Sequence, residues 1–166
     1  MIQATRPRTL QDLIDRADIS DVVHRYATGV DSRDWALLRS VFAEEVLCDT
    51  RSWVGGGPQL MRADDFVPWV ASVLSGFDAT RHYSSNHVHR IEDDEATCVS
   101  NMVALHYLAE GEARGMHASI GYYTHGLKRS PGGWLIHAHQ LMITADVGER
   151  ALHERARARW VAQKAS

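Results

Sequence analysis

The stretch RHYSSNHVHRIEDDEATCVSNMVALHYLA, residues 81–109, predicts two long β-strands joined by a tight turn. Apolar and polar residues alternate along both halves, and an acidic run at residues 92–95 separates them. An alternation with a period of two is the pattern of strands that have one buried face. Upstream of about residue 78 the apolar residues recur instead every three to four positions, as in helices. The chain therefore changes from helix to sheet near Arg81.

Two more alternating segments follow toward the C-terminus, and the connections between all four are short and rich in turn residues. Such connections are typical of antiparallel hairpins. The last part of the chain returns to helical spacing and carries several arginines. We expect strands at about residues 81–91, 96–109, 115–128 and 134–146, and a final helix at about 148–162.

The N-terminal part predicts three helices and one strand. Thr9 is placed to cap the first helix, and either Asp31 or Ser32 could cap the second. The run Gly55-Gly-Gly-Pro58 predicts a loop, because glycine and proline interrupt regular structure. We expect helices at about residues 10–30 and 63–77, a strand at about 46–53, and a short second helix with Trp35, Leu38, Val41 and Phe42 on one face.

This order of elements predicts an α+β fold, in which the helices are segregated from one antiparallel sheet. Helices that close a strongly curved sheet would enclose a pocket on its concave face. The chain has 166 residues and no long linker or internal repeat. We therefore expect a single domain over residues 1–166, with its core at about 10–146.

The composition is that of an ordinary globular protein, with 45% hydrophobic and 23% charged residues. A net charge of -3 gives no reason to expect a nucleic-acid partner, because phosphate binding requires a basic surface. No apolar run resembles a signal peptide or a membrane span, so we expect no membrane partner and a cytoplasmic location. Cys48 and Cys98 lack the spacing of metal ligands and are expected to be buried free thiols.

Two polar segments together suggest a catalytic site. Asp31 stands where the first helix ends, and His82 stands early in the first long strand. If the fold brings them together, the carboxylate can orient the imidazole and raise its basicity. His82 would then be a general base that needs no cofactor. His82 also shares one face of its strand with Ser84 and Asn86, which predicts a polar row along a pocket.

Other side chains could complete this site. His106, on the next strand, could be a second general acid or simply a histidine at a solvated rim. Tyr26, Tyr107 and Tyr123 could donate hydroxyl hydrogen bonds to a developing enolate, or could only fill the core.

The loop Gly55–Gly57 beside Trp53 could be a mobile flap over the pocket or a plain surface loop. The residues that we expect to contact substrate are Tyr26, Asn86, Tyr123 and Trp53.

The ten histidines of the chain raise the question of a metal. His87 with His89, and His137 with His139, each place two imidazoles on one face of a strand, which suits metal ligation. The sequence offers no well-spaced third ligand, and polar positions that face outward would also explain both pairs. We therefore expect no metal and no other cofactor.

The helix end Tyr26-Ala-Thr-Gly-Val-Asp31 and the strand start Arg81-His-Tyr-Ser-Ser-Asn86, with the order of elements, resemble the SnoaL-like proteins. These belong to the nuclear transport factor two-like superfamily, and the resemblance extends from about residue 10 to 143. It implies a cone-shaped, curved antiparallel sheet with N-terminal helices over a central pocket. Scytalone dehydratase, bile acid dehydratases, hexachlorocyclohexane dehydrochlorinase and polyketide cyclases are members.

The resemblance also implies roles for particular residues. The dehydratases and the dehydrochlorinase pair an aspartate with a histidine at the positions of Asp31 and His82. The second histidine of scytalone dehydratase matches His106, and Tyr123 matches a pocket position of the family.

This chain departs from the pattern at the groups that hold the substrate. The two tyrosines that act on the carbonyl in scytalone dehydratase would fall at Val30 and Thr50, and its serine and asparagine at Gly121 and Tyr123. The lysine of the dehydrochlorinase would fall near Tyr26. The resemblance therefore implies the paired aspartate and histidine, but the substrate of neither enzyme.

We expect a lyase or isomerase that acts on a small hydrophobic or cyclic carbonyl compound by proton abstraction and dehydratase-like β-elimination. A polyketide cyclase is the nearest alternative, because ring closure uses the same first step. A non-catalytic small-molecule-binding protein, or a structural subunit like the β subunits of ring-hydroxylating dioxygenases, would share the fold. We expect a homodimer or homotrimer.

Overall fold

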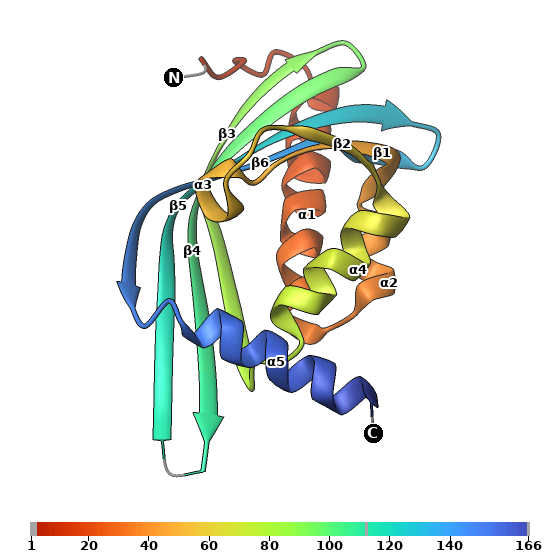
Figure 1. Ribbon diagram of the computed structural model, residues 1–166. Helices are drawn as coiled ribbons and strands as arrows, with labels where there is room; N and C mark the ends of the chain where they lie inside the picture. The colour runs from red at the N-terminus through yellow and green to blue at the C-terminus, as the bar shows by residue number, and fades with distance from the viewer. Residues whose placement is uncertain (1–2, 112, 166) are drawn as a thin grey trace.

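A computed structural model describes residues 3–111 and 113–165 of the chain (Figure 1). The helices are α1 (Leu10–Ser32), α2 (Trp35–Ser40), α3 (Arg51–Val54), α4 (Ala63–Leu74) and α5 (Leu152–Ala165). The strands are β1 (Phe42–Asp49), β2 (Gln59–Arg62), β3 (Ala79–Glu92), β4 (Glu95–Glu110), β5 (Ala113–Ser130) and β6 (Gly133–Gly148).

The six strands form one curved, unclosed sheet in the order β2-β1-β6-β5-β4-β3. Strands β3 to β6 make three consecutive antiparallel hairpins, which confirms the prediction from their short connections. Strand β1 differs, because it pairs parallel to β6 while β2 runs antiparallel along its other edge. The predicted α+β architecture is confirmed, with one parallel pairing that the sequence did not suggest.

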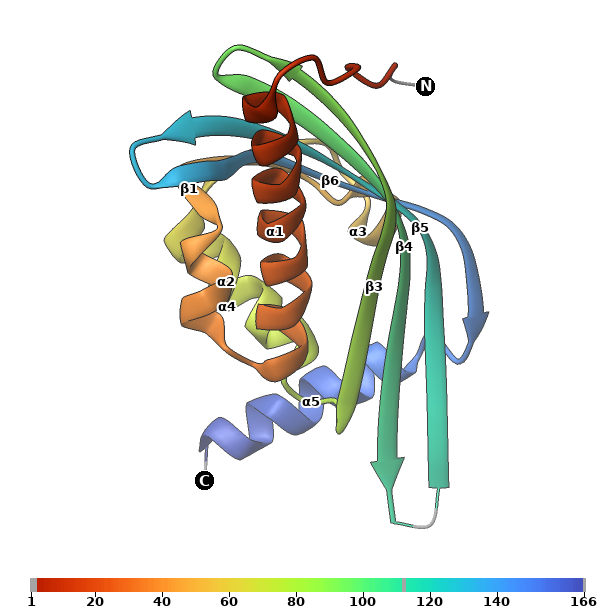
Figure 2. The same ribbon diagram turned by 180° about the vertical axis from the view of Figure 1, so that it is seen from behind.

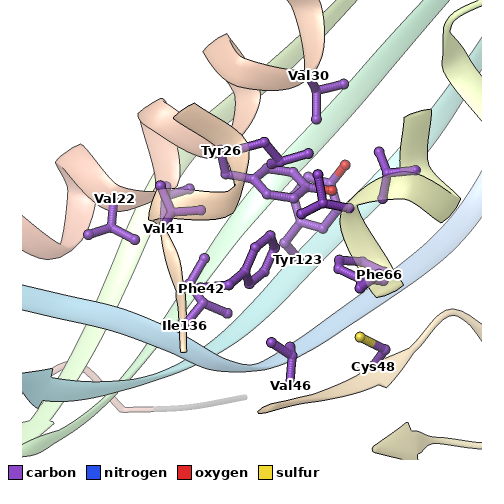
Figure 3. Packing of buried hydrophobic residues seen from close by; sticks show 14 of the residues in the cluster. Val22, Tyr26, Val30, Val41, Phe42, Val46, Cys48, Phe66, Tyr123 and Ile136 are labelled. Atoms are coloured by element: carbon purple, nitrogen blue, oxygen red, sulfur yellow. The ribbon is translucent and has the colours of Figure 1, made fainter. Parts of the chain in front are cut away.

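The sheet curves around α1, α2 and α4, and α5 crosses its open end (Figures 1 and 2). Helix α1 turns an apolar stripe toward the sheet, and Ile19, Val23 and Val30 on this stripe are fully buried. Figure 3 shows where this stripe meets α4 and the sheet, with Tyr26 and Tyr123 in the same packed cluster. Burial of this apolar surface is the main stabilising contribution to the fold.

The ends of α1 are set by local hydrogen bonds. Thr9 accepts a hydrogen bond from the Asp12 backbone while the Asp12 side chain bonds back to Thr9, so the predicted N-cap is confirmed. Arg33 has a left-handed backbone (φ 60°) and ends the helix. The N-cap of α2 is Asp34, so the expectation that Asp31 or Ser32 caps it was wrong. Asp31 lies inside α1, and its carboxylate is available for another role.

The strand expected at 46–53 was only partly right. Strand β1 begins four residues earlier and ends at Asp49, and the next residues form the short helix α3. Two side chains hold this turn: Arg51 donates two hydrogen bonds back to Asp49, and Ser52 donates to the Leu141 carbonyl at 2.7 Å. Strand β2 was not expected at all.

The last helix starts at Leu152 rather than near 148, because β6 continues to Gly148, whose φ of 90° favours glycine. Cys48 and Cys98 are buried free thiols, as expected. Within the described ranges, no helix combines the length and the apolar character that crossing a membrane requires.

Candidate functional site

A cavity lies between the concave face of the sheet and helices α1, α4 and α5. Apolar side chains make most of its wall, and they include Phe66, Met102 and Leu141. Four histidines line it as well: His82, His106, His139 and His153. A concave, mainly apolar site with a few polar groups is the usual form of a small-molecule pocket.

Asp31 and His82 meet at this cavity. Oδ1 of Asp31 lies 2.7 Å from Nδ1 of His82, and its Oδ2 accepts a hydrogen bond of 2.7 Å from the His82 backbone N–H. The His82 side chain is only 6% exposed. Because a carboxylate accepts hydrogen bonds, Nδ1 carries the proton and Nε2 is the nitrogen left unprotonated in the neutral ring. The pairing that the sequence suggested is therefore present in the structure.

Two residues that the sequence did not single out hold the carboxylate in place. The Thr80 hydroxyl donates a hydrogen bond of 2.9 Å to Oδ1 of Asp31, and Arg33 donates one of 2.7 Å to that hydroxyl. Burial raises the pKa of Asp31, but the hydrogen bonds and charge of His82 and the bond from Thr80 outweigh it. The pKa of Asp31 lies below its ordinary value, so Asp31 stays ionised beside the imidazole.

His106 is next to this pair and is deeply buried. Its ring centroid lies 5.6 Å from that of His82, and the residue is 4% exposed, so it is not at a solvated rim. Burial, together with the nearby His82, His153 and His117, lowers the pKa of His106 to about 2. The ring is therefore neutral near pH 7 and offers one N–H donor and one bare nitrogen.

Three of the four expected substrate contacts line the cavity. Tyr26 and Tyr123 pack edge to face with ring centroids 5.5 Å apart, and both line its wall. Trp53 also lines the wall, and its ring lies 4.4 Å from that of His153. Tyr107 does not line the cavity, because it follows His106 and so faces the other side of β4.

Asn86 was placed wrongly. A β-bulge between Ser85 and Val88 adds a residue, and Asn86 takes up the left-handed conformation (φ 54°) with its side chain exposed. Alternation is broken there, so Asn86 does not share a face with His82. The bulge turns His87 and His89 inward instead, and His89 is 4% exposed.

The interpretation that these histidines occupy outward-facing positions was therefore wrong for His87, His89 and His139. The Ser20 hydroxyl lies 2.9 Å from Nε2 of His89 and 3.0 Å from Nδ1 of His87. On β6, His139 is 2% exposed and its Nδ1 lies 3.1 Å from Nε2 of His125. His89, His125 and His139 are buried, and each has one ring nitrogen in a hydrogen bond.

Sequence reasoning missed two histidines of the region, His117 and His153. His117 stands directly opposite His106 in the β4–β5 pairing, and Nε2 of His153 lies 3.1 Å from Nδ1 of His117. The hairpin register could have revealed His117, because the turn near residue 111 sets which residues face each other. His153 gave no such signal, since the docking of α5 depends on contacts between distant parts of the chain.

Comparison with known proteins agrees with this geometry. The SnoaL-like domain family matches residues 11–140, and the chain belongs to that family. No curated protein sequence matches this chain.

Solved structures show the same nuclear transport factor two-like fold. The Kfla4162 protein from Kribbella flavida is 26% identical and has a TM-score of 0.80, with 87% of this chain and 99% of that chain covered. A candidate scytalone dehydratase from Novosphingobium aromaticivorans is 18% identical, with a TM-score of 0.71 and coverage of 84% and 90%. A hexachlorocyclohexane dehydrochlorinase, LinA type 3 from Novosphingobium barchaimii, is 22% identical, with a TM-score of 0.66 and coverage of 87% and 96%.

Proposed function

We propose that this protein is a lyase or isomerase that acts on a small hydrophobic or cyclic carbonyl compound, with His82 as the general base. The observation that supports it is the 2.7 Å contact between Asp31 and His82 at the wall of an apolar cavity. The names of two structural neighbours, a dehydrochlorinase and a candidate dehydratase, both describe eliminations, which favours the same reaction class here.

The proposed reaction begins with the transfer of a proton from carbon to nitrogen. Nε2 of His82 takes the proton next to the substrate carbonyl, and the electron pair of the broken C–H bond moves toward the carbonyl oxygen to form an enolate. Loss of a hydroxide from the β-carbon, with a proton, then gives water and an unsaturated carbonyl compound. Return of the proton to another carbon would instead complete an isomerisation.

Asp31 is proposed as the positioning residue for this step. Its hydrogen bond holds the proton on Nδ1, so Nε2 stays free to accept, and its charge stabilises the imidazolium that forms. His106 is neutral and lies beside His82, where we propose that it donates a hydrogen bond to the departing hydroxyl or to the enolate oxygen. Tyr26, Tyr123 and Trp53 are proposed as the substrate contacts.

Hydrogen–deuterium exchange tests the first step directly. In deuterated buffer, the protein should catalyse deuterium incorporation next to the carbonyl of small cyclic ketones that raise its melting temperature. His82→Gln and Asp31→Asn should each slow this exchange by about 10²–10⁴-fold, the usual scale of general acid–base catalysis. His82→Gln should leave ligand binding largely intact, because the base acts mainly in the transition state.

Matched control variants are available for both residues. Asp21 is exposed on the same helix as Asp31, and His137 is a half-buried histidine that does not line the cavity. Asp21→Asn and His137→Gln should exchange at the unmodified rate. Equal exchange by the Asp31→Asn variant and the original protein would reject the catalytic assignment and favour a non-catalytic binding protein. Co-purification with a large iron–sulfur subunit would identify a structural subunit instead.

The nearest alternative function is that of a polyketide cyclase. The same enolate would then attack a second carbonyl carbon of the substrate and close a ring. Its product would have the mass of the substrate, or that mass less water, and would contain a new carbon–carbon bond.

We also propose assembly into a homodimer or homotrimer through the outer face of the sheet. Tyr83, Val103 and Ile120 stand in one row across β3, β4 and β5, and Tyr83 is 57% exposed. An apolar row of this kind is typical of a surface that another copy covers.

A further inference from the structure

Three histidines from distant parts of the chain converge beside the cavity. His106 comes from β4, His117 from β5 and His153 from α5, and one ring nitrogen of each lies within 4.8 Å of the others. His106 and His117 are 4% and 0% exposed, and His153 is 9% exposed. The three buried rings lie close together, with centroids 6.0 Å apart for His106 and His117, 4.5 Å for His106 and His153, and 5.0 Å for His117 and His153.

Their hydrogen bonds are incomplete. Nε2 of His153 meets Nδ1 of His117 at 3.1 Å, but among the described residues nothing pairs with the buried Nδ1 of His106. Nε2 of His117 lies 3.3 Å from Oδ1 of Asp146, without the alignment of a hydrogen bond. A buried polar atom without a partner is costly, which points to a group that would engage Nδ1 of His106 between the two other rings.

We propose that His106, His117 and His153 bind a zinc-class divalent cation. Zinc bound by imidazoles has Zn–N distances of about 2.0–2.1 Å, so two nitrogens of a tetrahedral site are about 3.3 Å apart. The distance of 3.1 Å between His153 and His117 is close to this value. The ligand nitrogen of the third ring, His106, lies within 4.8 Å of those of the other two, a gap that a side-chain adjustment can close.

A carboxylate behind the proposed ligands suits this cation in charge and in orientation. Asp146 faces the far nitrogen of His117, as carboxylates do behind metal-bound histidines. Ser119 donates a hydrogen bond of 3.0 Å to the same carboxylate oxygen and holds it in place.

The ligand count indicates an open site. Three protein ligands leave a fourth tetrahedral position, and two of the three, His106 and His153, line the cavity. A cation there would face the same space as His82 and could polarise a substrate carbonyl. The chain lacks the tyrosines that do this in scytalone dehydratase. The site can bind metal whether or not His82 is a base, so this inference does not depend on the proposed function.

A second group of potential ligands, His87, His89 and Cys98, is the weaker candidate. The Ser20 hydroxyl already contacts both of its histidine rings. Burial raises the pKa of the Cys98 thiol to about 12, which disfavours the thiolate that would bind a metal. The expectation of no metal rested on the strand pairs alone and could not include a ligand from α5.

Metal titration of the full chain tests the site without any substrate. After treatment with a chelator, the protein should bind about one equivalent of zinc, and cobalt(II) should give the visible spectrum of a tetrahedral nitrogen site. His117→Gln and His153→Gln should each weaken binding by at least about 100-fold, and Asp146→Asn by about 10–100-fold. His137→Gln is the matched control and should bind normally. Circular dichroism should verify that every variant is folded.

Two results would overturn the proposal. One is the absence of zinc and cobalt binding by the folded, chelator-treated protein. The other is binding that survives both His117→Gln and His153→Gln but is lost in His89→Gln. His82→Gln separates the two proposals, because it should retain the metal even where deuterium exchange is lost. Exchange without any metal binding would reject only the metal site.

Discussion

At the scale of single residues, Asp31 shows how a carboxylate becomes a fixed part of a site. It accepts hydrogen bonds from the His82 backbone, from Nδ1 of His82 and from the Thr80 hydroxyl. Three donors leave it one preferred orientation, so the imidazole is held in one orientation too. Thr80 is 1% exposed and in turn accepts from Arg33, which places a cation behind the carboxylate.

Thr80→Val should disturb this arrangement without changing the shape of the side chain. Loss of a hydrogen bond to a charged group costs about 1.5–3 kcal/mol, so we expect deuterium exchange to slow by about 10-fold or more. Valine also removes one of the two acceptors of Arg33 Nη1, which keeps only the Val30 carbonyl, so the urea midpoint should fall. Thr124→Val, on the outer face of β5, is the matched control and should change neither quantity. Unaltered exchange in Thr80→Val would show that Thr80 does not position Asp31.

The sequence could predict this pair but not its whole surroundings. Asp31 and His82 stand at a helix end and a strand start, and a resemblance to a family supported their meeting. The predicted position of Asn86 was wrong because a β-bulge shifts the alternation by one residue. The local sequence carries no clear sign of this bulge. Thr80 and Arg33 are ordinary residues whose role depends on where the two elements cross.

At the scale of elements, α5 closes the cavity by packing against the end of α4. Gly76 lies at this contact: a Cβ atom there would come within 1.8 Å of the Ala156 backbone oxygen. Leu152 and Ala156 are fully buried on the same side of α5. The sequence showed only a helix that carries several arginines, whereas in the structure this helix has a buried stripe that includes His153.

Gly76→Ala should therefore loosen or shift α5. Because the clash is with backbone, the neighbour cannot move aside cheaply, and we expect a loss of about 1–3 kcal/mol in the free energy of unfolding. Denaturant unfolding measures it, and hydrogen exchange should rise in α5 before the rest of the chain. Gly132→Ala is the control, since its nearest contact, Ser130 Oγ, is at 3.9 Å. Equal stability of the two variants would show that α5 is not packed at Gly76 as described.

Elements with strong periodicity were predictable, and short ones were not. Four long strands and three long helices followed from periodicity and from caps such as Thr9. Helix α3 and strand β2 have only four residues each, too few for a period to be recognised. Their positions depend on contacts with β6 and β1 across the sheet.

At the scale of the whole molecule, buried neutral histidines make stability depend on pH. His139 and His125 are 2% and 0% exposed and share one hydrogen bond in the core. Burial lowers the pKa of His139 to about 4 and holds that of His125 well below its ordinary value. Both are neutral in the folded state, whereas the unfolded chain binds protons at about pH 6.5. Stability is therefore present above that pH and is lost as the pH falls toward 4.

Acid unfolding should reveal this dependence. Between about pH 7.5 and about pH 5, each of the two rings should lower the free energy of unfolding by about 2 kcal/mol, so we expect a total fall of about 4 kcal/mol. Asp15 does not contribute in this window, because its hydrogen bonds from Arg129 keep its pKa at about 2. Urea titrations at several pH values measure the change. The same stability at both ends of the range would mean that these rings gain protons without unfolding the core.

The parallel pairing of β1 with β6 has a consequence for how the chain folds. Ser52, just after β1, bonds to the backbone of Ile143, which is 91 positions further along the chain. The hairpins β3 to β6 can form from neighbouring segments, but β1 has no partner in the sheet other than β2 until β6 exists. Pairings between such distant segments close large loops and slow folding. During synthesis, one edge of β1 therefore stays unpaired until β6 has been made. About half of the chain lies between these two strands.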